Sequence, residues 1–249
     1  MRPIFALALA FSVVAQMGCN DTHPSKTSTT RVITSTSPAA SPKQASGFTN
    51  VETNDANASA FFSADELARA NTAANATYMS EQERRFIFLS NLARLDGARF
   101  TKAYLDGYIK TSVEYKESSQ FVRSLRTDLA KTKGLTMLQP LPALAQSSKA
   151  HASELGKAGK TGHSSLNGEG FDKRIGRFLP QYRELSENET FGFNRSDALH
   201  CLMAYLVDEG LPDAGHRKTC LDKNLTHTGV SILTHTKYQF GCVVDYAQL

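Results

Sequence analysis

The spacing of apolar residues is helical in the first part of this chain and strand-like near its end. This order limits the folds that the chain can adopt. Between residues 80 and 95, apolar side chains recur every three or four positions, which is typical of a helix with one buried face. Residues 227–234 and 238–246 are instead rich in β-branched and aromatic side chains and flank a short polar link, which predicts an antiparallel hairpin. Helices first and strands last indicate an α+β fold rather than alternating α/β units.

Capping signals mark where the helices begin and end. Ser80 and Glu83 have the spacing of a capping box, in which each side chain satisfies a backbone N–H group of the first turn. Gly210 predicts the end of a helix that Ser196 begins. Two helices are expected to begin at Ser63 and Ser80, and a last one to run from Ser196 to about Glu209. Between them we expect helices at about 100–109, 118–132 and 141–158. The helix at 141–158 has Pro142 in its first turn and Gly159 after its end.

Residues 1–19 resemble an export signal. The apolar run from Ile4 to Ala15 follows a single early charge and is too short to span a bilayer. Cleavage after Ala15 is one alternative. The other is cleavage before Cys19, as in a bacterial lipoprotein, which would attach the chain to a membrane through a lipid on Cys19. Either alternative predicts an exported protein, located in the periplasm, on the outer surface of a bacterial membrane or outside the cell.

Composition separates the rest of the chain into a linker and a folded part. Residues 20–60 are mostly small and polar, and such a segment buries too little apolar surface to order itself, so we expect a disordered linker. Residues 61–249 then form a helical extension followed by a domain whose core covers about 85–249. The net charge of +4 is dispersed, and the absence of a basic stripe excludes nucleic acid as a predicted partner.

Three cysteines lie in the last fifty residues, at Cys201, Cys220 and Cys242. Disulfides persist in exported proteins, and no C-x-x-C pair suggests a zinc knuckle. If Cys19 carries a lipid, at most one bridge forms, with three possible pairings. Cys220 lies between the other two in sequence, which favours a bridge from Cys220 to Cys201 or to Cys242.

The chain lacks HExxH, G-x-S-x-G and P-loop motifs, so no catalytic residue can be assigned from a motif. Short polar segments remain at residues 162–164, 186–189 and 215–217, and we expect them in Gly-flanked loops. They supply two imidazoles and carboxylates, a set that suits a divalent metal such as zinc, or a base with its orienting partner. His151 is interpreted as a packing or helix-surface residue, and Arg174 as a charge on a helix face.

Five segments carry motifs in the order found in one family: FLSNLAR at 88–94, LAQSSKAHA at 144–152, TGHS at 161–164, SEN at 186–188 and GHR at 215–217. With GVS at 229–231 and CVVDY at 242–246, they resemble the CAP superfamily (cysteine-rich secretory proteins, antigen 5 and pathogenesis-related 1, also called SCP-like), in its bacterial extracytoplasmic branch. The resemblance implies an α-β-α sandwich with a central antiparallel sheet.

The resemblance also implies a cleft with two histidines and two acids. Carried over by motif, these are His163, His216 and Glu187, which would also be the metal ligands. The second acid follows a Trp by one helical turn in many members, and Asp208 occupies that offset from Tyr205 here. The chain departs from the family in three places: Ser186 replaces a Gly, Lys-Thr-Cys at 218–220 replaces Asn-Ile-Leu, and the Trp is missing.

Some family members bind sterols, lipids or metal in the cleft. The resemblance therefore favours a binding module for a small ligand, a lipid or a divalent metal, with zinc as the expected ion. Two alternatives are a metal-dependent hydrolase or peptidase-like enzyme, for which the sequence shows no marked nucleophile, and a protein-interaction module of the cell envelope.

Overall fold

The computed structural model describes residues 55–249. The predicted signal peptide, Cys19 and most of the predicted linker lie outside the described residues. No helix in the described range is long and apolar enough to cross a bilayer. The elements are α1 (Ala56–Ser59, at the end of the predicted linker), α2 (Ala64–Ala70), α3 (Glu81–Leu95), α4 (Gly97–Phe100), a π-helical turn η2 (Thr101–Leu105), α5 (Asp106–Thr111), α6 (Gln120–Lys131), β1 (Gln139–Pro140), α7 (Pro142–Ala158), α8 (Phe171–Phe178), β2 (Glu184–Gly192), α9 (Ala198–Val207), α10 (Gly215–Cys220), β3 (His227–His235) and β4 (Gln239–Gln248).

The sheet has four strands in the order β1-β3-β4-β2. The predicted hairpin is confirmed, because β3 and β4 pair antiparallel, and β2 pairs antiparallel with the other edge of β4. The short strand β1 runs parallel to β3 and pairs only with His227 and Thr228. β2 was not predicted: residues 186–189 lie in this strand and not in a loop.

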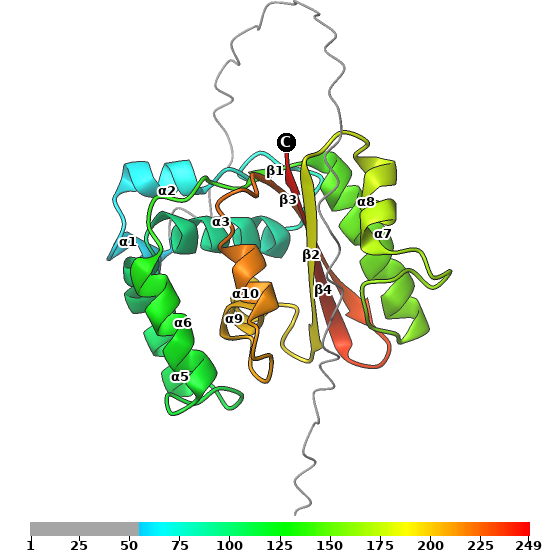
Figure 1. Cartoon of the computed structure of the whole chain (residues 1–249). Coiled ribbons are helices and arrows are strands. Elements are labelled where there is room, and N and C mark those ends of the chain that lie inside the picture. The colour runs from blue at the N-terminus through cyan, green and yellow to red at the C-terminus, as the bar shows by residue number, and fades with distance from the viewer. Residues whose placement is uncertain (1–54) are drawn as a thin grey trace, which may run out of the picture. The chain divides into compact units, whose positions relative to one another are not determined.

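Helices cover both faces of the sheet, so the predicted α+β fold with an α-β-α sandwich is confirmed. Figure 1 shows α7 and α8 on one side of the sheet and α3, α9 and α10 on the other. The larger apolar core lies on the α3 side and includes Phe86, Tyr205 and Val244. A smaller core under α7 and α8 contains Leu144 and Ile175.

Several helix ends follow the sequence signals. The helix expected at about 100–109 is instead divided into α4, η2 and α5, and residues 215–217, expected in a loop, begin α10. Ser80 and Glu83 form the predicted capping box of α3, and α7 begins at Pro142 and ends at Gly159, which has a φ of 64°. At α9 the prediction was wrong by one residue at the start and by two at the end. Asp197 caps its start in place of Ser196, and Asp208, with a φ of 56°, ends it before Gly210.

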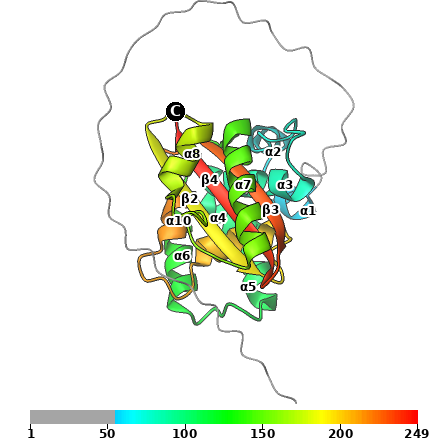
Figure 2. The same ribbon diagram turned by 90° about the vertical axis from the view of Figure 1, so that its right-hand side faces the viewer.

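α7 packs directly on β3 because two positions at the contact have no side chain, Gly156 on α7 and Gly229 on β3. A Cβ atom at Gly156 would lie 2.5 Å from the carbonyl oxygen of Thr234. A Cβ atom at Gly229 would lie 2.1 Å from the backbone N of Ala145. Only glycine permits this close approach of helix and strand. The contact fixes α7, and with it His151, over the sheet (Figure 2).

The three cysteines of the described chain are buried free thiols, so the predicted bridge from Cys220 is not formed. Cys220 Sγ instead lies 3.4 Å from Asn188 Nδ2 and 3.6 Å from the hydroxyl of Tyr246. Burial raises the pKa of the Cys220 thiol to about 12. Cys220 is therefore an unreactive packing residue of α10.

Candidate functional site

Strand β2 presents its polar residues alternately to the two faces of the sheet. Side chains two apart along a strand share a face, so Glu187 and Glu189 lie on the same side. Both contact residues of α7, α8 or the loop between them. Asn188 points the other way and donates from Nδ2 to the carbonyl of His216, at 3.0 Å. Residues 186–189, which were predicted as one loop, therefore contribute polar side chains to both faces of the sheet.

Glu187 is the centre of the first polar cluster. Its side chain is fully buried, and its Oε1 lies 2.9 Å from Nδ1 of His163. Its Oε2 accepts a charged hydrogen bond from Arg174 on α8, and Arg174 also donates to the carbonyl of His163, at 3.0 Å. Arg174 is buried rather than exposed on a helix face, so that interpretation was wrong. Its guanidinium compensates a carboxylate that could not otherwise be buried in charged form.

The pKa values of the pair reflect this arrangement. Burial alone would raise the pKa of Glu187, but the hydrogen bond from His163 and the charge of Arg174 outweigh it, and the pKa is lowered. Burial would lower the pKa of His163, but the hydrogen bond to Glu187 and the charges of Glu187 and Glu189 raise it. The structure therefore favours the charged forms of both partners.

His151 lies in the same cluster and is fully buried. Its Nδ1 is 2.7 Å from Oε1 of Glu154, one turn along α7. Its Nε2 is 3.1 Å from the carbonyl of Gly162 and 2.8 Å from Oε1 of Glu189. Burial disfavours the charged ring, but Glu189 and Glu187 raise the pKa of His151 above its ordinary value. His151 is thus a member of the site, and interpreting it as a packing or surface residue missed this role.

Glu189 is held in place by the loop after α7. Its Oε2 accepts a hydrogen bond from the backbone N–H of Gly162, at 3.0 Å. Its Oε1 is buried and receives no aligned hydrogen bond from any described residue, although His151 Nε2 is close by. A buried carboxylate oxygen normally has a donor, so this atom has room for a proton or a cation as a partner.

These residues include one group that could hold a metal ion. Ligand atoms of His151, Glu187 and Glu189 all lie within 4.8 Å of one another. One imidazole and two carboxylates suit zinc. Glu154 on His151 and the Gly162 N–H on Glu189 would orient two of the ligands from behind. The residues therefore fit a divalent metal, although both oxygens of Glu187 are engaged, Oε1 by His163 and Oε2 by Arg174.

Asp245 on β4 lies directly opposite Glu187 in the antiparallel register. It is fully buried, and within the described chain neither of its oxygens has an aligned hydrogen-bond partner. Burial and the charge of Glu187 raise its pKa far above the ordinary value. Burial and the neighbouring Glu187 charge therefore favour the neutral form of Asp245.

His216 and Asp208 form a second polar pair. Nδ1 of His216 lies 2.7 Å from Oδ1 of Asp208, and the backbone N–H of His216 donates to Oδ2, at 2.9 Å. The Asp208 side chain is fully buried, whereas that of His216 is 21% exposed. The ring of His216 also packs on Tyr205.

The structure thus pairs the four predicted cleft residues two by two, as His163 with Glu187 and His216 with Asp208. Of the predicted metal ligands, Glu187 belongs to the group described above, and His163 and His216 do not. Sequence reasoning missed Glu189 because it did not identify β2 as a strand. Had it done so, the two-residue spacing of Glu187 and Glu189 would have placed both on one face.

Comparison with known proteins gives one family and two structures. The CAP family, described as the cysteine-rich secretory protein family, matches residues 91–246. A structure of an extracellular protein containing an SCP domain from Bacillus anthracis str. Ames is 21% identical, with a TM-score of 0.39, and the match covers 51% of this chain and 37% of that one. An outer surface protein from Borrelia burgdorferi is 19% identical, with a TM-score of 0.40, over 51% of this chain and 88% of that one.

No curated protein matches this chain. The match of this chain spans 37% of the length of the Bacillus protein, so that protein is considerably larger than the shared part. The family match covers more than half of the chain here and includes His163, Glu187 and His216. It confirms the resemblance of the motifs and agrees with the sandwich of helices about the sheet: this chain belongs to the CAP family.

Proposed function

We propose that this CAP domain is an exported binding module whose buried site on β2 holds a divalent cation through His151, Glu187 and Glu189. The observation that carries the proposal is the position of the His151 ring among three acceptor atoms, on Glu154, Gly162 and Glu189. A neutral imidazole has one N–H group and one lone pair. If Nδ1 donates to Glu154, the lone pair of Nε2 faces a carboxylate oxygen with nothing between them.

Two states that remove this repulsion differ in what lies between Nε2 and Glu189, a proton or a metal ion. The ring can take a second proton and become an imidazolium, or a metal ion can bind between Nε2 and Glu189. In the second state Glu154 plays the role of the carboxylate that commonly orients a metal-binding histidine. The metal and the proton therefore compete for the same place.

The charge of the cluster supports a divalent ion. With neutral histidines, the carboxylates of Glu154, Glu187 and Glu189 face one guanidinium, that of Arg174, which leaves a charge of about −2. One divalent cation balances this charge, and so do protons on His151 and His163. Zinc suits a site with an imidazole ligand better than magnesium or calcium does.

Burial favours binding over turnover. The His151 and Glu187 side chains are fully buried, and that of Glu189 is nearly so. A catalytic metal keeps a coordination position open to substrate, whereas a structural one is enclosed. The walls of this site are charged, which also argues against a lipid as its ligand.

Calorimetric titration of the metal-free protein with zinc tests the proposal. We expect one site per chain, weakened more than about tenfold in His151→Gln and in Glu189→Gln. Glu184→Gln, at the start of the same strand, is the matched control and should leave the affinity unchanged. His216→Gln should also bind zinc normally. Loss of binding in His216→Gln with normal binding in His151→Gln would instead support the ligand set implied by the family motifs.

A second candidate function, hydrolysis, is favoured by the His216–Asp208 pair. A buried carboxylate that holds a partly exposed imidazole by Nδ1 is the arrangement by which a general base is oriented. A peptide library would reveal this activity as turnover that His216→Gln abolishes and His200→Gln retains. Absence of turnover by the unaltered protein would argue against it.

We infer the location from the N-terminal sequence. The apolar run before Cys19 supports export, and the Gly-Cys pair supports a lipid anchor. Mass spectrometry of the mature protein tests the anchor. A mass that begins at Cys19 with attached acyl chains supports it, and an unmodified mass that begins after Ala15 contradicts it.

A further inference from the structure

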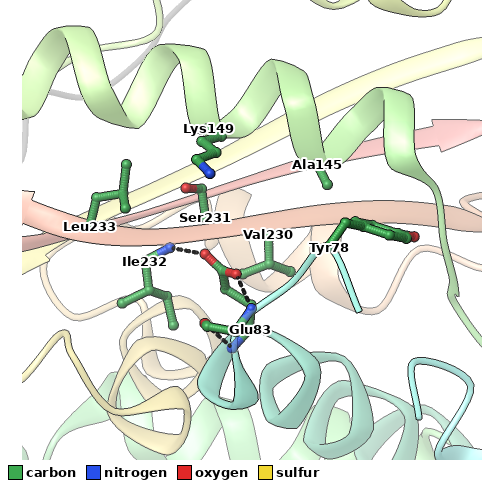
Figure 3. Close-up of a pocket in the computed structure, with 9 residues that line it drawn as sticks. Tyr78, Glu83, Ala145, Lys149, Val230, Ser231, Ile232 and Leu233 are labelled. Atoms are coloured by element: carbon green, nitrogen blue, oxygen red, sulfur yellow. Dashed lines mark hydrogen bonds between the residues drawn. The ribbon is translucent and has the colours of Figure 1, made fainter. Parts of the chain in front are cut away.

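A cavity lies at the edge of the sheet, away from the site on β2. It has a volume of about 200 Å³ and opens between the start of α3, the middle of α7 and the outer edge of β3 (Figure 3). Its lining is contributed by Tyr78, Ser80, Glu83, Ala145, Lys149 and residues 230–233. None of these residues belongs to the metal site or to the His216–Asp208 pair.

The cavity exists because β3 lacks a neighbouring strand there. β1 pairs with β3 only as far as Thr228, so the described chain places no strand beside Val230 or Ile232. The N–H group of Ile232 donates instead to Oε1 of Glu83, at 2.9 Å. The other oxygen of Glu83 accepts the N–H of Ser80, at 2.7 Å. Both carboxylate oxygens are thus engaged, and Glu83 is a fixed part of the wall.

Two donors face the remaining space. Ser231 is 1% exposed, and its hydroxyl has no hydrogen-bond partner among the described residues. Lys149 makes no ion pair within the described part of the chain. Figure 3 shows the Lys149 amine and the Ser231 hydroxyl pointing toward one another from α7 and β3. A buried hydroxyl without a partner is unfavourable unless something else binds it.

The rest of the lining is partly polar and partly apolar. The polar part is Ser80 and Glu83, whose carboxylate already accepts the N–H groups of Ser80 and Ile232. On the side of β3 that carries Ser231, the apolar part includes Ala145, and Tyr78 has 46% of its surface exposed. At about 30 Å³ for each water-sized group, the volume accommodates roughly six or seven heavy atoms. A ligand of this size that satisfies both donors carries an anionic acceptor and a short apolar chain.

We propose that this cavity binds a carboxylate with a short apolar body, such as valerate. The carboxylate oxygens accept hydrogen bonds from Lys149 and Ser231, and the apolar chain packs on Ala145 and Tyr78. The same chemistry occurs in a free short-chain acid and in the C-terminal residue of a peptide that ends in valine. The site does not depend on the metal-binding function proposed above.

The test is an NMR titration of the ¹⁵N-labelled full chain with valerate. We expect saturable shifts of the amides of Ser231 and Ile232. Lys149→Met should weaken binding about tenfold, and Ser231→Ala by a smaller factor, since Lys149 supplies an opposite charge as well as a hydrogen bond. Lys157→Met is the matched control, because it removes the same charge about two turns further along α7.

Valeramide, which has the same shape without the charge, should not bind. Equal binding of valerate and valeramide, or unchanged binding to Lys149→Met, would overturn the proposal, as would absence of saturable shifts at Ser231 and Ile232. A tripeptide ending in valine, with a free or an amidated C-terminus, separates the two sources. Tighter binding of the free-acid peptide than of valerate identifies a peptide C-terminus, and weaker binding identifies a free acid.

Discussion

Asp208 closes helix α9 in a left-handed conformation, with a φ of 56°, and its carboxylate holds both the ring and the backbone N–H of His216. A residue other than glycine rarely adopts this conformation, and such strain persists where surrounding contacts enforce it. The contacts that enforce it here are those to His216 and the start of α10.

We expect Asp208→Ala to lower the free energy of unfolding by about 2–4 kcal/mol, because it leaves buried donors of α10 without an acceptor. Asp208→Asn should cost about half as much, since asparagine tolerates the left-handed region and retains one acceptor. Urea denaturation measures both. A loss below about 1 kcal/mol in Asp208→Ala would show that the carboxylate's hydrogen bonds contribute little.

Helix α8 carries two arginines that differ in burial and so provide a matched pair. Arg174→Leu should destabilise the protein by about 3–5 kcal/mol, because it leaves the Glu187 carboxylate buried without its cation. Arg177 is 60% exposed and pairs with Glu169, so Arg177→Leu should cost less than about 1 kcal/mol. Chemical denaturation at neutral pH compares them. Similar losses would indicate that Glu187 relaxes toward solvent when Arg174 is absent.

Stability should fall as the pH rises above 6.5. The pKa values of His151 and His163 are raised in the folded state, so each contributes stability that is complete below its unfolded pKa of about 6.5 and is lost as the pH passes its folded pKa. Glu187 has a lowered pKa, so its contribution is present above the ordinary value of 4.5 and is lost as the pH falls through the folded pKa. The free energy of unfolding, measured against pH in the presence of a chelator, should therefore be highest between about pH 4.5 and 6.5 and decline on both sides.

Replacement of the histidines tests the origin of the alkaline decline. His151→Gln and His163→Gln should each flatten it, whatever their effect on absolute stability. Burial lowers the pKa of His227, so His227→Gln should leave the slope above pH 6.5 unchanged. An unaltered slope in both site variants would assign the decline to other groups.

Zinc binding should release protons. The metal needs the lone pair of His151 Nε2, so near pH 6.5 binding should displace about one proton from that ring. Calorimetry in two buffers of different ionisation enthalpy counts the protons. The release should disappear at a pH well above the folded pKa of His151. Binding without proton release near pH 6.5 would place the metal elsewhere.

Gly229 should be intolerant of even a methyl group. Its Cβ would lie 2.2 Å from the backbone carbonyl carbon of Leu144, so Gly229→Ala must push α7 away from β3 at a cost above about 3 kcal/mol. Gly107 is the control, because a Cβ there meets nothing within 4 Å, and Gly107→Ala in α5 should be neutral or stabilising by up to about 1 kcal/mol. Thermal denaturation of the two variants makes the comparison.

Local signals in the sequence predicted much of the fold. The capping box at Ser80, the Pro142 and Gly159 boundaries of α7 and the β-rich tail all depend on residues close together in the chain. β2 was missed because its sequence, ELSENETFG, is largely polar and becomes a strand by pairing with β4, about fifty residues later.

The site was harder to predict for the same reason. The motifs singled out His163, Glu187 and His216, but the fold decides which of them meet. His151 meets Glu189 through the packing of α7 over β3 and β4, and Arg174 meets Glu187 from a separate helix. A helical pattern cannot show that one of its charges is buried, because the compensating group lies on another element.

The bond from Ile232 to Glu83 has a consequence for the behaviour of the protein in concentrated solution. An open strand edge is a template on which a second molecule can extend the sheet, and a charge placed against the edge is one means of preventing this. Glu83 accepts the hydrogen bond of the outward-facing N–H group of Ile232 and brings a negative charge to the outer edge of β3. The same carboxylate that starts helix α3 thereby keeps neighbouring copies from joining their sheets, so its loss would promote aggregation even where the fold itself survives.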